Sequence, residues 1–305
     1  MISNKQHTLA GEYEFRGKGL HTGKVSRMIL RPAPAGTGIV FLRTDIGDNA
    51  FVEALAENVS STARSTTVSE GGVSVSTIEH LMSAFAGLGI DNARVEIDNV
   101  EVPILDGSAR LYAEAIARDG LKEQDADRKY IEIPEEIEVR DEKSGAFIRI
   151  TPSQTPSVDL TVDFGSRVLG VQTAHWDGDT DYAAQIAPCR TFVFFHEIEY
   201  LFQNNLVKGG DVENAIVIVE HPVTQEQIDR LSALFNVQKL AISDNGYLNN
   251  LQLHFPNECG RHKLLDLIGD LRLAGGILNA KVTAFKPGHA LNTRAAAEIR
   301  RKLGY

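Results

Sequence analysis

The chain has 305 residues, of which 43% are hydrophobic and 24% charged, and its formal net charge is -10. The acidic balance argues against a nucleic-acid-binding surface, which needs clustered Lys and Arg, and the length favours two domains. No apolar segment is long enough to cross a bilayer or to act as a secretion signal, and only two cysteines are present, so we expect a cytoplasmic protein without a disulfide framework.

Strands and helices alternate in the first part of the chain. Residues 11–15, 25–30 and 39–42 carry β-branched and aromatic residues between Gly and Pro breaks, which is typical of strands, and GLHTG at 19–23 predicts a turn. Apolar residues recur with helical spacing over 77–88. The segment ARVEI–DNVE–VPIL at 93–105 predicts a hairpin, and a helix follows the capping residue Ser108 to about Arg118.

The charged stretch at 121–129 lacks apolar periodicity and predicts an interdomain linker, so we divide the chain into residues 1–124 and 125–305. Strands follow at YIEI, AFIRI and SVDLTVDF. A Phe-rich segment at 191–206 precedes the strand NAIVIVE. A long helix over 261–274, the strand NAKVTAF and a final helix from Thr293 complete the chain.

An internal echo links the two parts. EHLMSAF followed by IDNARVEI in the first part corresponds to RHKLLDLIGDLRLAG followed by LNAKVTAF in the second. Each is a helix with an early His, a Gly-containing turn and a strand. We therefore expect two related α+β domains that pack helix layer to helix layer, with two β-sheets outside. Two unrelated α+β domains would explain the same elements.

His262, Asp266 and Asp270 recur every four residues in the predicted helix over 261–274. Their side chains therefore share one face of that helix. Imidazole nitrogen and carboxylate oxygen are both ordinary zinc ligands, and an i, i+4 pair can present them to one ion. The same spacing fits a solvated helix face with a His–Asp hydrogen bond, and this helix alone does not decide between the two.

Glu79 and His80 are neighbours near the start of the first predicted helix. A catalytic zinc site takes three protein ligands, keeps one position for water, and uses a nearby carboxylate to accept the proton of that water. The alternative is structural. Ser76 and Glu79 match the S-x-x-E capping box, in which Glu79 only satisfies the helix terminus, and His80 would be a core histidine.

His289 follows the strand NAKVTAF in a Gly-containing segment, KPGHA. A histidine in such a loop can face a cleft and protonate a leaving amine as a general acid. A nearby carboxylate such as Asp270 would orient the ring and favour its charged form. An exposed loop histidine without a role is the alternative.

The motifs TIEHLMSAF, RHKLLDLIGDL and GHALN resemble those of the UDP-3-O-acyl-N-acetylglucosamine deacetylases of lipid A biosynthesis, as do GLHTG, VPILDGSA and RTF at 190–192. The resemblance runs in order over almost the whole chain. It implies two α+β domains whose helices lie between two outer sheets. It also implies hydrolysis of the N-acetyl group of a UDP-linked acylated amino sugar, giving acetate and a free amine, as the committed step of that pathway.

The resemblance also implies the roles of individual residues. The zinc ligands that it implies are His80, His262 and Asp266. Glu79 matches the general base, and His289 matches the cationic general acid with Asp270 beside it. Thr191 matches the hydroxyl that helps to stabilise the oxyanion of the tetrahedral intermediate.

The substrate-contacting positions implied by the resemblance are Phe192 and Lys263. A βαβ insert at about 194–219 matches the passage for the acyl chain, and the apolar run in this region is a candidate wall, although it equally fits a buried amphipathic helix. The anionic diphosphate needs local cations. The candidates in or beside the motifs are Arg190, Arg261, Lys263 and Lys286.

Two other functions fit the same residues. A zinc amidohydrolase with a different acylated sugar as substrate would use the same catalytic set. A non-enzymatic protein with a structural metal is the second, because Cys259 and His262 have the C-x-x-H spacing of a closed Cys/His/His/Asp site. The ligand set tolerates iron as well as zinc. Some family members carry a fused dehydratase domain, and nothing in the residues up to Tyr305 indicates that activity.

Overall fold

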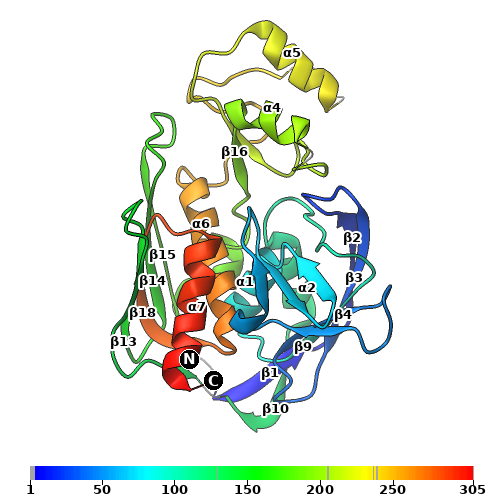
Figure 1. The fold of residues 1–305 in the computed structure, drawn as a ribbon, viewed down its shortest axis with the longest axis vertical. Helices are drawn as coiled ribbons and strands as arrows, with labels where there is room; N and C mark the ends of the chain where they lie inside the picture. The colour runs from blue at the N-terminus through cyan, green and yellow to red at the C-terminus, as the bar shows by residue number, and fades with distance from the viewer. Residues whose placement is uncertain (1–3, 129, 205, 236, 238–239, 305) are drawn as a thin grey trace.

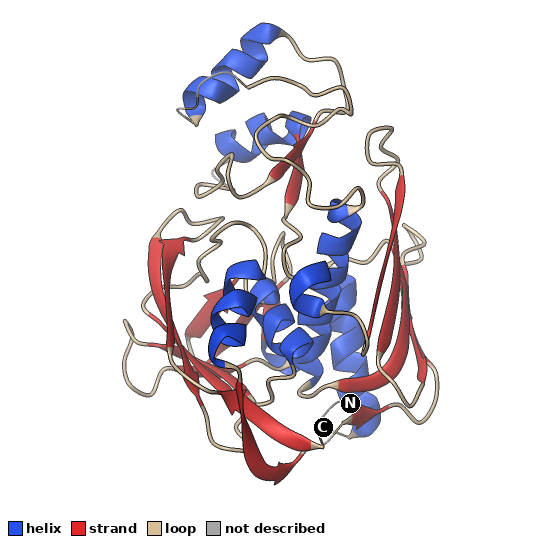
Figure 2. Ribbon diagram, turned by 180° about the vertical axis from the view of Figure 1, so that it is seen from behind, coloured by secondary structure: helices blue, strands red, loops and turns tan. Residues whose placement is uncertain are grey.

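The structure is a computed structural model, and it describes residues 4–128, 130–204, 206–235, 237 and 240–304. Two mixed β-sheets form outer layers, and helices fill the space between them (Figures 1 and 2). A smaller lobe lies beyond one end of this sandwich. The predicted α+β class, with helices between two outer sheets, is therefore confirmed.

The two outer sheets have the same topology. In hydrogen-bonding order, the first contains β2 (Tyr13–Lys18), β3 (Val25–Pro32), β9 (Ala93–Ile97), β4 (Ile39–Arg43) and β5 (Phe51–Glu53). The second contains β12 (Ile137–Arg140), β13 (Phe147–Pro152), β18 (Leu278–Phe285), β14 (Ser157–Asp163) and β15 (Val171–Asp177), with β11 (Ile131–Glu132) also paired to β18. Successive pairings in both are antiparallel, antiparallel, parallel and antiparallel. The two halves thus repeat one fold, as the sequence echo predicts.

One helix precedes the central strand of each sheet and another follows it. These helices are α1 (Glu79–Leu88) and α2 (Arg110–Asp119) around β9, and α6 (Glu258–Leu271) and α7 (His289–Leu303) around β18. The short helix α3 (Tyr182–Gln185) lies between β15 and the lobe in the sequence. Leu81 and Phe85 of α1 and Leu264 and Leu267 of α6 are completely buried in one cluster that draws on both halves. A single core therefore joins the two halves.

Helix α1 packs closely against α6 where α6 carries Gly269. A Cβ added at Gly269 would overlap the carbonyl oxygen of Glu79 and come within 3.0 Å of the amide nitrogen of Ser83. Only a residue without a side chain allows the two backbones this distance. The contact brings the first turn of α1 beside the middle of α6.

Residues 93–105 do not form the predicted hairpin. The chain leaves the sheet after β9, because Glu101 forms a parallel bridge with Ser76 instead of pairing with β9. Ser76 ends the last strand of a three-stranded sheet made of β6 (Val59–Ser61), β7 (Thr67–Glu70) and β8 (Val73–Ser76). The apolar residues of VPIL face the core without belonging to a strand.

The charged segment predicted to be a linker is a strand. β10 (Leu121–Asp127) pairs antiparallel with β1 (Lys5–Leu9) in a two-stranded ribbon. Most β10 side chains stay exposed or half-exposed on both faces, so the sequence lacks the alternation of a strand with one buried face. The predicted boundary between residues 124 and 125 falls within β10, and the division into two domains stays a prediction. Lys129, the last residue of the predicted linker, lies outside the described residues.

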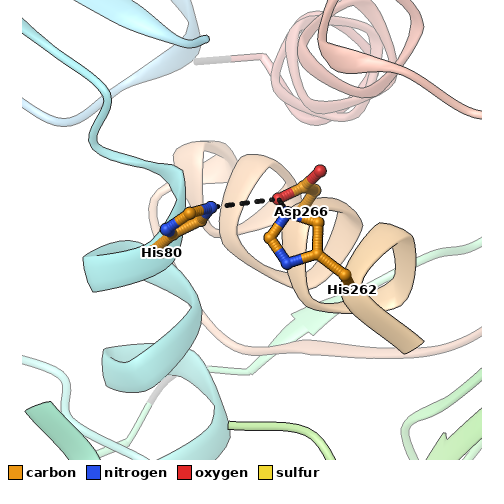
Figure 3. Close-up of side chains that lie close together, drawn as sticks. All are labelled: His80, His262 and Asp266. Carbon is orange, nitrogen blue, oxygen red and sulfur yellow. Dashed lines mark ion pairs between the residues drawn. The ribbon is translucent and has the colours of Figure 1, made fainter. Parts of the chain in front are cut away.

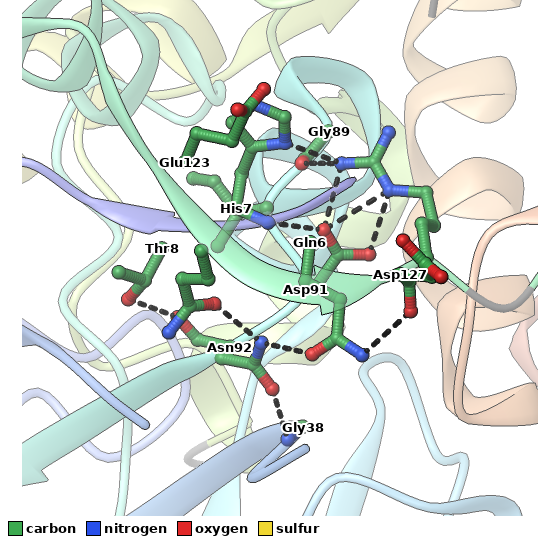
Figure 4. A network of polar contacts seen from close by, with 12 residues as sticks. Gln6, His7, Thr8, Gly38, Gly89, Asp91, Asn92, Glu123 and Asp127 are labelled. Atoms are coloured by element: carbon green, nitrogen blue, oxygen red, sulfur yellow. Dashed lines mark hydrogen bonds and ion pairs between the residues drawn. The ribbon is translucent and has the colours of Figure 1, made fainter. Parts of the chain in front are cut away.

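A polar network fastens this ribbon to the core (Figure 4). Nη2 of Arg128 lies 2.7 Å from an oxygen of Asp91 and donates to the carbonyl oxygen of Gly89 at 2.6 Å. Asn92 donates to Gln6 at 2.8 Å. These bonds connect the end of α1 to both strands of the ribbon.

The lobe contains β16 (Phe192–Phe194), α4 (Phe195–Gln203), β17 (Ile216–Ile218) and α5 (Gln225–Leu234). β16 and β17 pair in parallel with α4 between them, so they form a βαβ unit. Helix α5 begins with a capping box between Thr224 and Gln227. None of the helices in the described ranges is long and apolar enough to span a membrane.

We predict that Gly269→Ala destabilises the protein by roughly 1–3 kcal/mol, because the added methyl group forces α1 away from α6. The gain in helix propensity, about 1 kcal/mol, offsets part of this cost. Chemical denaturation would measure the change. Gly288→Ala is the control for a methyl group added without a clash, since its Cβ would meet nothing within 4 Å, and it should lose only the cost of Ala at an N-cap, about 1 kcal/mol. Wild-type stability of Gly269→Ala would contradict the close packing.

Candidate metal centre and catalytic groups

Glu79 is the first residue of α1, and it does not cap the helix as the S-x-x-E pattern allows. Ile78 is the N-cap, without a side-chain capping bond, and Ser76 belongs to β8. The Glu79 side chain instead turns inward, where its Oε2 accepts a hydrogen bond of 3.0 Å from the amide of Thr66. Glu79 is only 3% exposed, so its carboxylate lies in the interior beside the helix start.

His80, His262 and Asp266 meet at the α1–α6 contact (Figure 3). Oδ1 of Asp266 lies 3.6 Å from Nε2 of His80 and 3.4 Å from Nε2 of His262. One possible ligand atom from each residue lies within 4.8 Å of the other two. In the described part of the chain, buried Oδ1 of Asp266 has no hydrogen-bond partner. Two imidazole nitrogens and this unpartnered oxygen are the donor set that a zinc site uses.

The remaining polar atoms of two of these side chains are occupied, and this orients the free ones. Nδ1 of His262 donates to the carbonyl oxygen of Cys189 at 3.0 Å, which leaves the Nε2 lone pair for a cation. Nζ of Lys263 donates to Oδ2 of Asp266 at 2.7 Å, which leaves Oδ1 toward the histidines.

Burial sets the charge state of the three residues. It lowers the pKa of His80 to about 3 and also lowers the pKa of His262, so both rings are neutral near pH 7, the form that binds metal. Burial alone would raise the pKa of Asp266, but the positive charges of His262, when that ring is protonated, and of Lys263 outweigh it and hold that pKa below its usual range. The group therefore offers one negative and two neutral donors.

His289 is the first residue of α7, which begins there rather than at Thr293 as predicted. Gly288 is the extended N-cap, and its carbonyl oxygen accepts the amide hydrogen bonds of Leu291 and Asn292 at 2.9 Å each. The ring is therefore held on a helix and is largely buried, with a side chain 11% exposed. It is not the exposed loop histidine of the structural alternative.

His289 lies between two carboxylates. Its Nδ1 is 2.9 Å from Oδ2 of Asp270, and its Nε2 is 3.9 Å from Oε1 of Glu79. Burial alone would lower the pKa of His289, but Asp270 and Glu79 outweigh it and raise that pKa to about 9. Burial raises the pKa of Glu79 to about 7, although His289 opposes the shift. The pair thus combines a proton acceptor near neutrality with a cationic proton donor.

Two residues at this site were missed by sequence reasoning. The hydroxyl of Thr66 donates to Oδ1 of Asp270 at 2.6 Å, and Nδ2 of Asn292 donates to Oδ2 of the same carboxylate at 2.9 Å. Asn292 follows His289 by three residues in GHALN, a spacing that places both on one helix face and could have indicated it. Thr66 has no such signal, because it lies in a run of Ser and Thr between two strands.

The predicted substrate-contacting residues lie beside the metal group, which consists of His80, His262 and Asp266. The ring of Phe192 meets the ring of His262 edge-on, with centroids 6.3 Å apart, and Nζ of Lys263 lies 5.7 Å from the centre of the Phe192 ring. Thr191 is anchored through its backbone, with its amide donating to Gly107 and its carbonyl accepting from Ile216, each at 2.8 Å. Its hydroxyl makes no hydrogen bond within the described residues.

An apolar cavity of about 130 Å³ adjoins Thr191 and Phe192. The lobe supplies one side, including Ile198 and Leu201 of α4, and the GLHTG turn supplies Leu20 and His21 on the other. This turn is held on both flanks. His21 contacts the carbonyl oxygen of Leu206 through Nδ1 at 2.8 Å, and Glu101 accepts the amides of His21 and Thr22 at 2.8 Å each.

The expected cationic patch does not form from all four candidates. Arg190 is buried against Glu258, with Nε 2.8 Å from Oε1, and Nζ of Lys286 lies 3.1 Å from Asp163. Among the predicted cations, only Lys263 reaches into the metal group.

Cys259 lies outside the metal group despite its C-x-x-H spacing with His262. The group found in the described residues contains only His80, His262 and Asp266. Cys259 packs instead in an apolar cluster with Ile218 and Tyr247, and burial raises the pKa of its thiol to about 12. Cys259 therefore lies apart from the three donor atoms, and the described residues do not form the closed Cys-containing site.

Comparison with known proteins agrees with the geometry. A family profile described as UDP-3-O-acyl N-acetylglycosamine deacetylase matches residues 6–235 and 233–301. The protein of Myxococcus xanthus named UDP-3-O-acyl-N-acetylglucosamine deacetylase is 40% identical over 97% of this chain and 87% of its own length. The protein of the same name from Teredinibacter turnerae is 40% identical over 98% of this chain and 91% of its own length.

Longer relatives match equally well. The Porphyromonas gingivalis protein named Bifunctional enzyme LpxC/FabZ is 42% identical over 299 residues, which cover 98% of this chain and 65% of that relative. The chain thus spans slightly less than two thirds of the length of such bifunctional relatives. Since the family profile covers nearly all of the sequence and the relatives are 40% or more identical, the chain belongs to the UDP-3-O-acyl N-acetylglycosamine deacetylase family.

Proposed function

We propose that this chain hydrolyses the N-acetyl group of a UDP-linked 3-O-(3-hydroxyacyl)-N-acetylglucosamine, releasing acetate and a free amine, in lipid A biosynthesis. The observation that carries the proposal is the meeting of His80 from α1 with His262 and Asp266 from α6. Family membership supports the substrate, because the relatives of similar length carry the name of that deacetylase. The two free, buried cysteines are compatible with the reducing cytoplasm, which we propose as the compartment.

Zinc is the proposed cofactor, held by His80, His262 and Asp266. Three protein ligands of this kind leave a coordination position open, as catalytic zinc sites do. When bound, zinc supplies a Lewis acid that lowers the pKa of water toward about 7 and polarises a carbonyl oxygen. The neutral imidazoles and the unpartnered Oδ1 of Asp266 support this assignment.

Glu79 is the proposed general base, and His289 is the proposed general acid. With its pKa raised to about 7, the Glu79 carboxylate can take a proton from the attacking water near neutral pH. His289, with its pKa raised to about 9, holds a proton at Nε2 that it can give to the leaving nitrogen. Asp270 accepts from Nδ1 of His289 and keeps that ring turned toward Glu79.

The remaining roles concern the substrate. We assign the Thr191 hydroxyl, which no described residue occupies, to hydrogen bonding with the developing oxyanion. Phe192 and Lys263 are the proposed contacts to the sugar, which their positions next to His262 and to each other support. The cavity walled by α4, β17 and the GLHTG turn is apolar and suits the first part of an acyl chain.

We predict that Glu79→Gln lowers kcat for acetate release by about two to four orders of magnitude, because the amide cannot accept the proton. Its zinc content should equal that of the wild type, since Glu79 is not among the ligands. Metal analysis beside an acetate assay with the acylated UDP-sugar would measure both.

Near-wild-type turnover of Glu79→Gln with full zinc would remove Glu79 from the role of base. The same assay distinguishes the substrate. Equal turnover of UDP-N-acetylglucosamine with and without the 3-O-acyl group would favour an amidohydrolase with another substrate.

For the metal, we predict that Asp266→Asn loses most of the bound zinc, because the charged ligand oxygen is replaced by a neutral one. Cys259→Ser is the control and should keep zinc and activity, since Cys259 packs in a separate cluster. Zinc per chain after dialysis would be the measurement. A matching loss of zinc in Cys259→Ser would indicate the closed Cys-containing site instead.

Asp270→Asn should move the alkaline limb of the kcat/KM–pH profile to lower pH. Asp270 is the leading cause that raises the pKa of His289. Without the negative charge of Asp270, His289 loses its proton at a lower pH. The protonated general acid therefore disappears at a lower pH than in the wild type. Asp141→Asn removes an exposed carboxylate in the turn between β12 and β13 and should leave the limb unchanged. An unmoved limb in Asp270→Asn would refute the pairing.

A further inference from the structure

Thr66 touches both of the groups proposed to move protons. Its amide donates to Oε2 of Glu79 at 3.0 Å, and its hydroxyl donates to Oδ1 of Asp270 at 2.6 Å. The hydroxyl oxygen also lies 3.4 Å from Nδ1 of His289. Thr66 is completely buried, so water does not compete for these bonds.

In both Glu79 and Asp270, one carboxylate oxygen is bonded to Thr66 and the other faces His289. Oε2 of Glu79 and Oδ1 of Asp270 are held by Thr66. Oε1 of Glu79 and Oδ2 of Asp270 then face the two nitrogens of His289, at 3.9 Å and 2.9 Å. One threonine thereby fixes the rotation of both carboxylates about the ring between them.

The backbone of Thr66 is itself fixed relative to α1. Its carbonyl oxygen accepts a hydrogen bond of 3.3 Å from the amide of Ile78, the residue before Glu79. Arg64, two residues before Thr66, has a φ of 67°, a left-handed conformation that turns the chain between β6 and β7. The threonine is therefore a rigid support for the start of the helix.

We propose that Thr66 is a positioning residue that sets the distance and orientation between the base Glu79 and the acid pair Asp270–His289. This inference rests on the proposed function. Thr66 touches neither ligand atoms of the metal group nor the cavity, so it acts through the two carboxylates. Any residue other than proline keeps the amide hydrogen bond to Glu79, whereas only a residue with a hydroxyl group, such as serine, can keep the bond to Asp270.

Losing the hydroxyl leaves Oδ1 of Asp270 buried without its donor. The carboxylate, still bonded to Asn292, can then rotate, and the His289 ring that it holds rotates with it. Misplacement of a catalytic group by about 1 Å can cost on the order of a hundredfold in rate. The effect falls on kcat, because the proposed substrate contacts Phe192 and Lys263 are unchanged.

The decisive comparison is Thr66→Ser against Thr66→Ala, which differ by one oxygen atom. We expect Thr66→Ser to keep kcat within about threefold of the wild type and Thr66→Ala to lower kcat by about tenfold to a hundredfold, with KM and zinc content unchanged in both. Thr66→Val, which keeps the shape without the hydroxyl, should match Thr66→Ala and replaces it if that variant is insoluble.

Thr8, which belongs to the polar network of Figure 4, provides a matched control outside the proposed site. It is 3% exposed, donates to the carbonyl oxygen of Asn92 at 2.7 Å and accepts from the amide of Ala33 at 2.9 Å. Thr8→Ala should lower the melting temperature but leave kcat at the wild-type value. A fall in kcat equal to that of Thr66→Ala would overturn the proposal, because loss of any buried hydroxyl would then suffice.

Two further results would overturn it. Equal kcat values for Thr66→Ser and Thr66→Ala would show that the hydroxyl does not matter, and loss of zinc from Thr66→Ala would show that it acts on the metal group instead. Both results require an active wild type. A wild type that releases no acetate from the acylated UDP-sugar would instead refute the proposed function itself, and the role of Thr66 with it.

Discussion

The contact between α1 and α6 is the interaction on which the rest of this molecule depends. Each helix carries only part of the site, with Glu79 and His80 on α1 and the other metal-group residues on α6. Gly269 permits the two backbones to approach until one helix touches the other without side chains between them. The repeated sheets on the outside hold this pair of helices in a common core, so the architecture supplies the distance between the ligands.

The site gathers several charges where water is nearly excluded. Its carboxylates are Glu79, Asp266 and Asp270, and its cations are Lys263 and His289. Each cation is paired with one carboxylate, Lys263 with Asp266 and His289 with Asp270. The nearest cation to Glu79 is His289, at 3.9 Å. This longer distance weakens the opposing charge effect, so burial raises the pKa of Glu79. One arrangement therefore holds Asp266 ionised and leaves Glu79 able to exchange a proton near neutral pH.

Sequence patterns predict the helices and strands that bury one face and expose the other, because their apolar residues then recur at regular spacing. The helices around the two central strands and the i, i+4 relation of His262 and Asp266 followed from local periodicity. Family motifs, rather than residue spacing, predict that His80 lies next to His262 and Asp266. The local sequence pattern of one helix does not show which other helix packs against it. The charged residues of β10 predict a linker, because both faces of this strand are largely solvated and leave no alternating pattern.

Other features escaped for the same reason, that their partners lie far away in the sequence. The segment after β9 has the sequence pattern of a hairpin, but Glu101 pairs with Ser76, which precedes it by 25 residues. Thr66 is an ordinary residue in a Ser/Thr run, and only its contacts with Glu79 and Asp270 distinguish it. Capping by Glu79 was equally plausible from sequence, but the inward-turned side chain excludes it.

The buried pair of Arg190 and Glu258 lies where the lobe meets the core. Arg190 precedes the first lobe strand, while Glu258 opens α6 after the lobe has ended, and Arg190 also donates to the carbonyl oxygen of Gln252 at 2.6 Å. The chain segment that enters the lobe and the segment that leaves it are thus bonded to each other where the lobe begins. Loops of different length or composition in the lobe can therefore be accommodated without displacing α6, which leaves the region lining the cavity free to vary.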